Sequence, residues 1–383
     1  MVDLGQIVRE EGPRYLQNRY VPFNQRKALR DIARCRTAAM GTVTNTCEDC
    51  SVVYRLFCSC RNRSCPACQG EARRNWLEAR RQEILPGSYL QMVFTSPSEL
   101  DVLARYCPAA LYDVLMRAAG QAIIDVGRSE LRARLGCQGQ LQTWSQLMAW
   151  HLHAHFVVPC GGFSEDGSRW ISFEPKDFPV AALRRRFRRL LCKYARVAAR
   201  QGKFDGLPAT VSLDQLLAKV MSRELKVYVA PPFGGPEKLF EYLARYMYRV
   251  AITNDRIESY EKGQVTFRWR DYRHSNRIRR FTMKVSEFLR RFATHIPPRR
   301  FVRVRSYGFM GNRNRKQNLE KARQLIGQVQ APAMRERPRP LRLCPSCHAA
   351  RGERGAPPFA PQPDLVSQLN LALRSPPIAP VAA

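Results

Sequence analysis

The run "HLHAHFVV", residues 151–158, places three of the chain's six histidines at every second position of an apolar segment. Successive side chains of a β-strand point to opposite faces, so a strand here would project His151, His153 and His155 from one face. The apolar residues between them would then face the core. Three neighbouring imidazoles predict a metal site, and the alternative is a set of edge-strand histidines bonded to water or backbone.

The composition predicts a polyanionic partner. Among 383 residues, 64 are Lys or Arg and 32 are Asp or Glu, which gives a formal net charge of +32. Such an excess favours nucleic acid as the partner. An anionic membrane surface is the rival, but no apolar run approaches the roughly 20 residues that span a bilayer, so no membrane partner is expected. The first twelve residues do not resemble a signal peptide, and we expect a cytoplasmic protein of a bacterium.

The thirteen cysteines predict bound metal. Two Cys-x-x-Cys pairs separated by 14 residues are typical of a four-cysteine structural zinc site in a reducing compartment. The predicted ligands of this Zn²⁺ are Cys47, Cys50, Cys65 and Cys68. Cys58 and Cys60 lie between the two pairs, and Cys60 is an additional candidate ligand. The run "CPSCH" at 344–348 supplies only half a site and needs ligands from elsewhere.

The segment 181–200 predicts an amphipathic helix with one strongly cationic side. It holds eight basic residues and no acidic one, and its apolar residues recur at helical spacing. The alternative is a charged face that contacts only solvent. The arginines predicted to contact DNA phosphates here are Arg184, Arg185, Arg188 and Arg189.

A second predicted helix carries two tyrosines, Tyr242 and Tyr246, one turn apart on the same face. This spacing is also common in core packing. Arg245 and Arg249 on the same segment are further candidate DNA contacts. A phenolate that attacks a DNA phosphorus forms a phosphotyrosine bond and frees a 3′-hydroxyl, so strands can be rejoined without ATP. A divalent ion would stabilise the developing charge, and no side chain in the sequence stands out as the general base.

Several stretches together resemble the IS91-type transposases, rolling-circle enzymes of the HUH (His-hydrophobic-His) nuclease superfamily. The matching stretches, between about residues 35 and 312, are "CRTAAMGT", "CSCRNRSCPACQG", "LQTWSQLMAWHLHAHFVVPCGGFSEDGSRW", "VYVAPPFGGPEKLFEYLARYMYRVAITNDRI", "FRWRDYR" and "EFLRRFATHIPPRRFVRVRSYGFMGN".

The resemblance implies an α+β fold: a small Cys-rich zinc-binding domain, then an HUH nuclease domain with a central antiparallel sheet flanked by helices. The expected boundaries are a helical lead-in at 1–36, the zinc-binding domain and its exit helix at 37–84, the catalytic domain at 85–315, and a basic, Pro-rich, largely disordered tail at 316–383.

For the site, the resemblance implies that His153 and His155 are the HUH pair, with His151 as a third ligand of a catalytic Mg²⁺ or Mn²⁺. Tyr242 would be the nucleophile and Tyr246 the second tyrosine of a two-tyrosine enzyme.

The sequence also departs from the family pattern. Relatives often have His at the positions of Val43 and Ser64, so a second zinc site built with Cys35 and Cys60 would be incomplete in this chain. The positions of Tyr248 and Leu152 are more often His and Pro.

The predicted function is a transposase that nicks and transfers single-stranded DNA at transposon ends through a 5′-phosphotyrosine intermediate. Its partners would be single-stranded DNA at the termini and the target site, together with host replication proteins. The alternatives are a plasmid replication initiator or relaxase with the same chemistry, and a non-catalytic zinc-dependent DNA-binding regulator.

Overall fold

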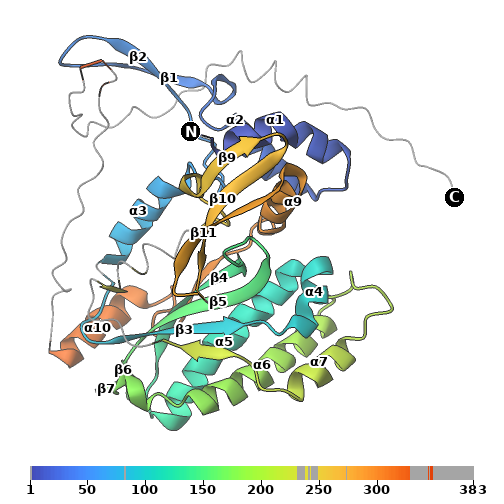
Figure 1. Ribbon diagram of the computed structural model, residues 1–383. Helices are drawn as coiled ribbons and strands as arrows, with labels where there is room; N and C mark the ends of the chain where they lie inside the picture. Colours follow the sequence, from blue (N-terminus) through green and yellow to red (C-terminus); the bar gives the residue numbers. More distant parts are fainter. Residues whose placement is uncertain are drawn as a thin grey trace. The chain divides into compact units, whose positions relative to one another are not determined.

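The computed structural model (Figure 1) describes residues 2–81, 83–230, 238–239, 242, 249–272, 274–327, 344 and 346–347. The chain divides into two compact units. The first comprises Met1–Val43 and Arg55–Glu336, and the second comprises Thr44–Tyr54 and Arg337–Ala383.

Helices and strands alternate irregularly along the chain. The helices are α1 (Leu4–Gln17), α2 (Phe23–Arg34), α3 (Gln69–Arg81), α4 (Asp101–Tyr106), α5 (Pro108–Glu130), α6 (Val180–Arg200), α7 (Leu213–Met221), α9 (Val285–Thr294) and α10 (Arg315–Ile326), with 3₁₀ turns at Ala38–Met40, Ser98–Leu100, Pro175–Asp177 and Asn254–Arg256. The strands are β1 (Thr42–Thr46), β2 (Val53–Phe57), β3 (Tyr89–Thr95), β4 (Gly136–Trp144), β5 (Trp150–Pro159), β6 (Gly161–Phe163), β7 (Trp170–Ser172), β8 (Val227–Val229), β9 (Ile257–Glu261), β10 (Gln264–Asp271), β11 (Arg277–Lys284) and β12 (Val304–Gly308).

A five-stranded sheet in the order β12-β4-β5-β3-β8 carries the histidine strand at its centre. Every neighbouring pair is antiparallel. The register sets His153 of β5 opposite Gln142 and Thr95, and His155 opposite Gln140 and Val93. The expected central antiparallel sheet, with the histidines on one strand, is therefore confirmed.

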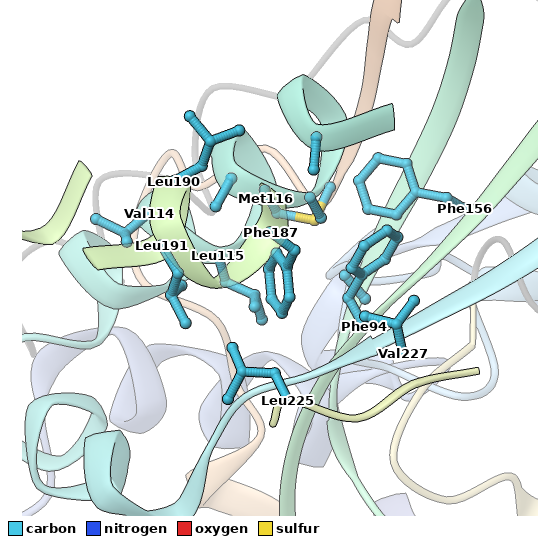
Figure 2. Close-up of a cluster of buried hydrophobic side chains, with 14 of the residues drawn as sticks. Phe94, Val114, Leu115, Met116, Phe156, Phe187, Leu190, Leu191, Leu225 and Val227 are labelled. Atoms are coloured by element: carbon cyan, nitrogen blue, oxygen red, sulfur yellow. The ribbon is translucent and has the colours of Figure 1, made fainter. Parts of the chain in front are cut away.

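One face of this sheet packs on α5 and α6, and that packing orients the strand (Figure 1). Phe156 of β5 lies on this side, and Figure 2 shows it beside Phe94 and Phe187. The ring centroid of Phe94 is 5.4 Å from that of Phe156 and 4.9 Å from that of Phe187, both edge-on. Full burial of one such ring contributes about 1.5–3 kcal/mol. Because side chains alternate along β5, the histidines are held on the opposite face.

A second core joins the N-terminal helices of the first unit to residues 251–296. Helices α1 and α2 pack on α9, and Leu29, Phe267 and Phe288 are fully buried members of this core. The strands β9, β10 and β11 form a three-stranded antiparallel sheet beside it. The segment 1–36, expected as a lead-in, therefore shares a core with residues from 251 to 296.

The predicted strand at 151–158 and the predicted helix at 181–200 are confirmed as β5 and α6. Helices α4 and α5 are separated at Cys107, because the following Pro108 disfavours a helical conformation for the residue before it. The first residues of the expected tail, 316–383, belong to α10, which continues to Ile326 and buries Leu319 and Ala322. In the part of the chain that the structure describes, no helix is both long and apolar enough to cross a bilayer.

Candidate active site

The three histidines lie in a row on one face of β5. The ring centroids of His151 and His153 are 4.8 Å apart, and those of His153 and His155 are 4.9 Å apart. His151 is exposed, His153 is buried and His155 is half-buried. The three side chains therefore share one face, as the strand period predicts, and His151 is the most exposed of them.

The surroundings hold these imidazoles in the neutral form. Burial lowers the pKa of His153 to about 4, and burial followed by the charge of His153 sets the pKa of His155 well below its usual range. The Nδ1–H of His153 donates to the backbone oxygen of His151 at 2.8 Å, since a carbonyl only accepts. The Nε2 lone pair of His153 is then available. Neutral imidazole is the form that binds metal ions.

The neutral state of the three histidines suits metal binding, but the distances between them suit a single ion less well. Within the described ranges, the groups that bring three or more possible ligand atoms within 4.8 Å of one another are two clusters of cysteines. The three imidazoles are spread more widely than that. A pair of adjacent histidines, with substrate oxygens completing the shell, fits the observed row better than a closed three-histidine site.

Tyr242 lies beside His155, the last histidine of the row. Its hydroxyl is 3.1 Å from Nδ1 of His155, and the Gln91 side-chain nitrogen is 3.4 Å from the same atom. Tyr242 is helical and only 6% exposed, and it packs with Leu239 and Val157 in a small apolar cluster. The structure thus brings together the imidazole and the phenol that the sequence places 87 residues apart.

A positively charged side chain, that of Arg249, also acts on His155. Arg249 is among the charges that lower the pKa of His155, after burial and His153. Its backbone oxygen accepts a hydrogen bond from Arg303 at 3.3 Å. The other predicted residues of this segment, Tyr246 and Arg245, lie outside the described residues.

A row of glutamines on β4 faces the same side of the sheet, and the sequence reading missed it. Gln140 is paired across the strands with His155 and is 1% exposed, yet neither its side-chain nitrogen nor its oxygen has a hydrogen-bond partner. Gln142 is paired with His153. The signal was available in "GCQGQLQTW", where Gln138, Gln140 and Gln142 repeat with the same period of two as the histidines.

The cationic helix α6 divides into engaged and exposed arginines. Arg184 forms an ion pair with Glu224 at 3.1 Å, and Arg188 donates to the backbone oxygen of Arg223 at 2.7 Å. Arg185 and Arg189 are exposed. The sequence predicted DNA contacts for all four of these arginines, but only Arg185 and Arg189 among them are exposed to solvent.

The cysteines form two clusters, and the predicted grouping was wrong. The four predicted ligands are divided between them: Cys65 and Cys68 lie in the first unit and Cys47 and Cys50 in the second. The members of the first cluster are Cys35, Cys60, Cys65 and Cys68. The members of the second cluster are Cys47, Cys50, Cys344 and Cys347. The physical reason is that Cys47 and Cys50 sit in the turn between β1 and β2, and β2 separates them along the chain from the second pair.

The first cluster is complete without the residues that relatives often supply as histidines. The Sγ atom of Cys68 is 3.4 Å from that of Cys35 and 3.6 Å from that of Cys60. Four thiols therefore meet although Val43 and Ser64 replace the expected histidines. The expectation that a site with Cys35 and Cys60 would be incomplete was wrong.

Comparison with known proteins gives consistent matches along the chain. The family model described as "Transposase zinc-binding domain" matches residues 7–96, and the one described as "Putative transposase" matches residues 136–318. The protein named "Putative transposase y4qJ" of Sinorhizobium fredii is 39% identical over 369 residues, which cover 90% of this chain and 93% of the relative. The transposase for insertion sequence element IS801 of Pseudomonas savastanoi pv. phaseolicola is 27% identical over 288 residues, covering 73% and 68%.

Among solved structures, the conjugative relaxase TrwC in complex with oriT DNA matches 40% of this chain and 69% of its own chain. The sequence identity is 15% and the TM-score is 0.23. At that TM-score the likeness supports no statement about the present chain.

Proposed function

The chain belongs to the IS91-type transposases, and from that premise we propose that it nicks single-stranded DNA at transposon ends and transfers the strand through a 5′-phosphotyrosine intermediate on Tyr242. The observation that carries the proposal is the 3.1 Å separation of the Tyr242 hydroxyl and His155 Nδ1. A nucleophilic phenol needs a partner that accepts or balances its proton, and a neutral imidazole at hydrogen-bond distance is such a partner.

His155 can assist Tyr242 in either of its neutral tautomers. With the proton on Nε2, its Nδ1 lone pair accepts the phenolic O–H and can take the proton as the attack begins. With Nε2 occupied by a cation, Nδ1 carries the proton and donates to the phenolic oxygen, which favours the phenolate. The two states place the proton differently, but both make the oxygen of Tyr242 a better nucleophile.

In the proposed reaction, the phenolic oxygen forms a bond to phosphorus while the bond from phosphorus to the 3′-oxygen breaks. The leaving 3′-oxygen takes up a proton, and the 5′-phosphate stays on Tyr242. The bond energy is retained, so a second 3′-hydroxyl can attack the same phosphorus and release the tyrosine.

The residues around Tyr242 supply charge and donors for the phosphate. A Mg²⁺ or Mn²⁺ ion held by His153 and His155 would polarise a phosphate oxygen when bound. The positive charge of Arg249 near His155 stabilises the negative charge that develops. The buried amide of Gln140, opposite His155, offers an unused donor on the same face.

Single-stranded DNA at the termini and the target site is the proposed substrate. The exposed Arg185 and Arg189 of α6 provide phosphate contacts away from the chemistry. Four thiolates would hold the structural Zn²⁺ expected from the family and would leave no open position, so this ion would stabilise the zinc-binding region without taking part in the strand transfer.

The test is the covalent adduct itself. The full chain is incubated with Mn²⁺ and a 3′-labelled single strand that carries the termini of the encoding element. The wild type should become labelled, and mass spectrometry should find the DNA on the peptide containing Tyr242. Tyr242→Phe should lower the adduct rate at least about 10³-fold while binding is kept, whereas the control Tyr106→Phe, at an exposed tyrosine of α4, should match the wild type.

Two results would overturn the proposal. A wild type that binds the strand but forms no adduct would favour the non-catalytic regulator. An undiminished adduct in Tyr242→Phe would move the nucleophile elsewhere, with Tyr246 as the next residue to map.

A further inference from the structure

The second cysteine cluster joins two distant parts of the sequence. Cys47 and Cys50 lie in the turn between β1 and β2, while Cys344 and Cys347 come from the run "CPSC" near the end of the chain. The paired residues are 294 and 300 positions apart. The family model for the zinc-binding domain ends at residue 96, so it covers only half of this cluster.

The spacing of the four sulfur atoms matches a single tetrahedral ion. Cys47 Sγ is 3.7 Å from Cys347 Sγ, and Cys50 Sγ is 3.7 Å from Cys344 Sγ. All four sulfurs lie within 4.8 Å of one another. A Zn–S bond of about 2.3 Å in a tetrahedron gives sulfur–sulfur edges of about 3.8 Å. A disulfide would need about 2.05 Å, which is much shorter than these separations of 3.7 Å.

The backbone around the sulfurs is arranged for thiolate ligands. The N–H of Ser346 donates to Cys344 Sγ at 3.4 Å, which stabilises negative charge on that sulfur. On the other side, Cys47 N–H donates to Val52 O, and Ser51 N–H donates to Cys47 O, both at 3.0 Å. These bonds fix the turn that carries Cys47 and Cys50. Cys47 is 4% exposed and Cys344 is fully buried, so these two side chains are shielded from water, whereas Cys50 is half-buried and Cys347 is exposed.

We propose that Cys47, Cys50, Cys344 and Cys347 form a second Zn²⁺ site, in which the C-terminal Cys-Pro-Ser-Cys motif completes the N-terminal Cys-x-x-Cys pair. Each pair alone supplies two thiolates, and two thiolates leave half of the tetrahedral shell to water. The ion thus ties the end of the chain to the β1–β2 turn. This site is independent of the strand-transfer chemistry proposed above.

Metal content tests the proposal directly. The full-length wild type, freed of loosely bound ions by dialysis against EDTA, should contain two Zn²⁺ per chain by plasma mass spectrometry. Cys344→Ser/Cys347→Ser should contain one, and Cys47→Ser/Cys50→Ser should also contain one. The quadruple variant should still contain one, because both pairs serve the same ion.

Matched controls assign the remaining ion. Cys60→Ser/Cys68→Ser should remove the other Zn²⁺, and its combination with Cys344→Ser/Cys347→Ser should remove both. Cys107→Ser/Cys160→Ser changes two half-buried cysteines outside the clusters and should keep two ions. Two Zn²⁺ in Cys344→Ser/Cys347→Ser, or none in the quadruple variant, would overturn the proposal. So would iron in place of zinc, which would colour the protein.

A measurement on the wild type alone tests the site even if the cysteine variants fail to fold. Alkylation by iodoacetamide, mapped by mass spectrometry, should leave Cys47, Cys50, Cys344 and Cys347 protected together. A strong chelator should expose all four at the same rate. Modification of Cys344 and Cys347 before chelation, at the rate of an unfolded thiol, would contradict the site.

Discussion

The histidine strand and the second cysteine cluster both gather metal-binding side chains, but they do so by opposite means. The histidines fall within five consecutive residues, and the pleat of β5 alone puts them on one face. The cysteines come from segments about 300 residues apart and meet only when the chain closes. The histidine row therefore depends on one strand, whereas the second cysteine cluster depends on a contact between two segments that are distant in the sequence.

The two regions also differ in what stabilises them. The sheet rests on a large apolar core that includes Phe94, Phe156 and Phe187, so its geometry needs no ion. In the second unit, the described residues that are buried are Cys47 and Cys344. The described part of this unit buries little apolar surface, and a segment of that kind gains stability from a metal ion or another cross-link. The comparison indicates that the apolar core forms the sheet without an ion, whereas the proposed Zn²⁺ would hold the second cluster together.

The largest expected effect is on the rate of adduct formation, and its absence would contradict this comparison. His155→Ala should lower the rate of adduct formation by about 10³-fold, because it removes the imidazole beside the Tyr242 hydroxyl. The zinc content and the far-ultraviolet circular dichroism should stay as in the wild type, because the sheet does not depend on an ion. Loss of zinc or of the spectrum in His155→Ala would mean that the two regions are not independent.

His151→Ala is the matched control for that variant. His151 is exposed, and the group that holds His153 is the backbone oxygen of residue 151, which alanine retains. We therefore expect a smaller loss of rate than in His155→Ala.

A second prediction sharpens the comparison through pH. His295 is buried beside β4, accepts from the Thr143 hydroxyl at 3.0 Å and donates to Met148 O at 2.9 Å. Burial lowers the pKa of His295 to about 4, below its ordinary value of 6.5. The unfolded chain therefore binds the proton first as the pH falls, and stability is lost between pH 6.5 and 4. The loss at pH 5 is about 2 kcal/mol.

Urea unfolding at pH 7, 6 and 5 measures this loss. The variant His295→Gln retains groups that can bond to Thr143 and Met148 but does not titrate in this range. The wild type should lose about 2 kcal/mol more than the variant between pH 7 and 5. Parallel pH profiles would show that His295 does not titrate as a buried group.

The smallest expected effect concerns the surface of α6. Arg185→Gln/Arg189→Gln should reduce the slope of log affinity against log salt for single-stranded DNA by about 1.4, since each lost phosphate contact accounts for about 0.7. Arg184→Gln/Arg188→Gln is the matched pair, and it should change the slope less because those guanidiniums already bond to Glu224 and to the backbone of Arg223. Equal slopes for both pairs would remove this distinction.

The sequence predicted what short-range periodicity controls. The alternation at 151–158 located the strand and the face of its histidines, and the apolar spacing at 181–200 located α6. The spacing of the cysteines predicted pairs of candidate metal ligands, but it could not decide which pairs lie together. Which pairs lie together depends on the β1–β2 turn and on contacts between segments far apart in the sequence, and no local sequence pattern predicts such contacts.

Sequence patterns did not predict two features of the candidate site, and the reason differs between them. The ion pair of Arg184 with Glu224 joins segments 40 residues apart, so the charge of α6 was overcounted. The unpaired amide of Gln140 follows the same period of two as the histidines, but its importance appears only when the register sets it opposite His155.

The meeting of residues 47 and 347 has a consequence for the order of biosynthesis. A ribosome adds about 5–20 residues per second, so the first two thiols emerge roughly 15 to 60 s before the two that complete their shell. During that interval the early pair has no partner from the same chain. A polypeptide released before residue 344 would never acquire the closing thiols, so retention of the proposed ion would distinguish chains that extend past Cys347 from shorter ones.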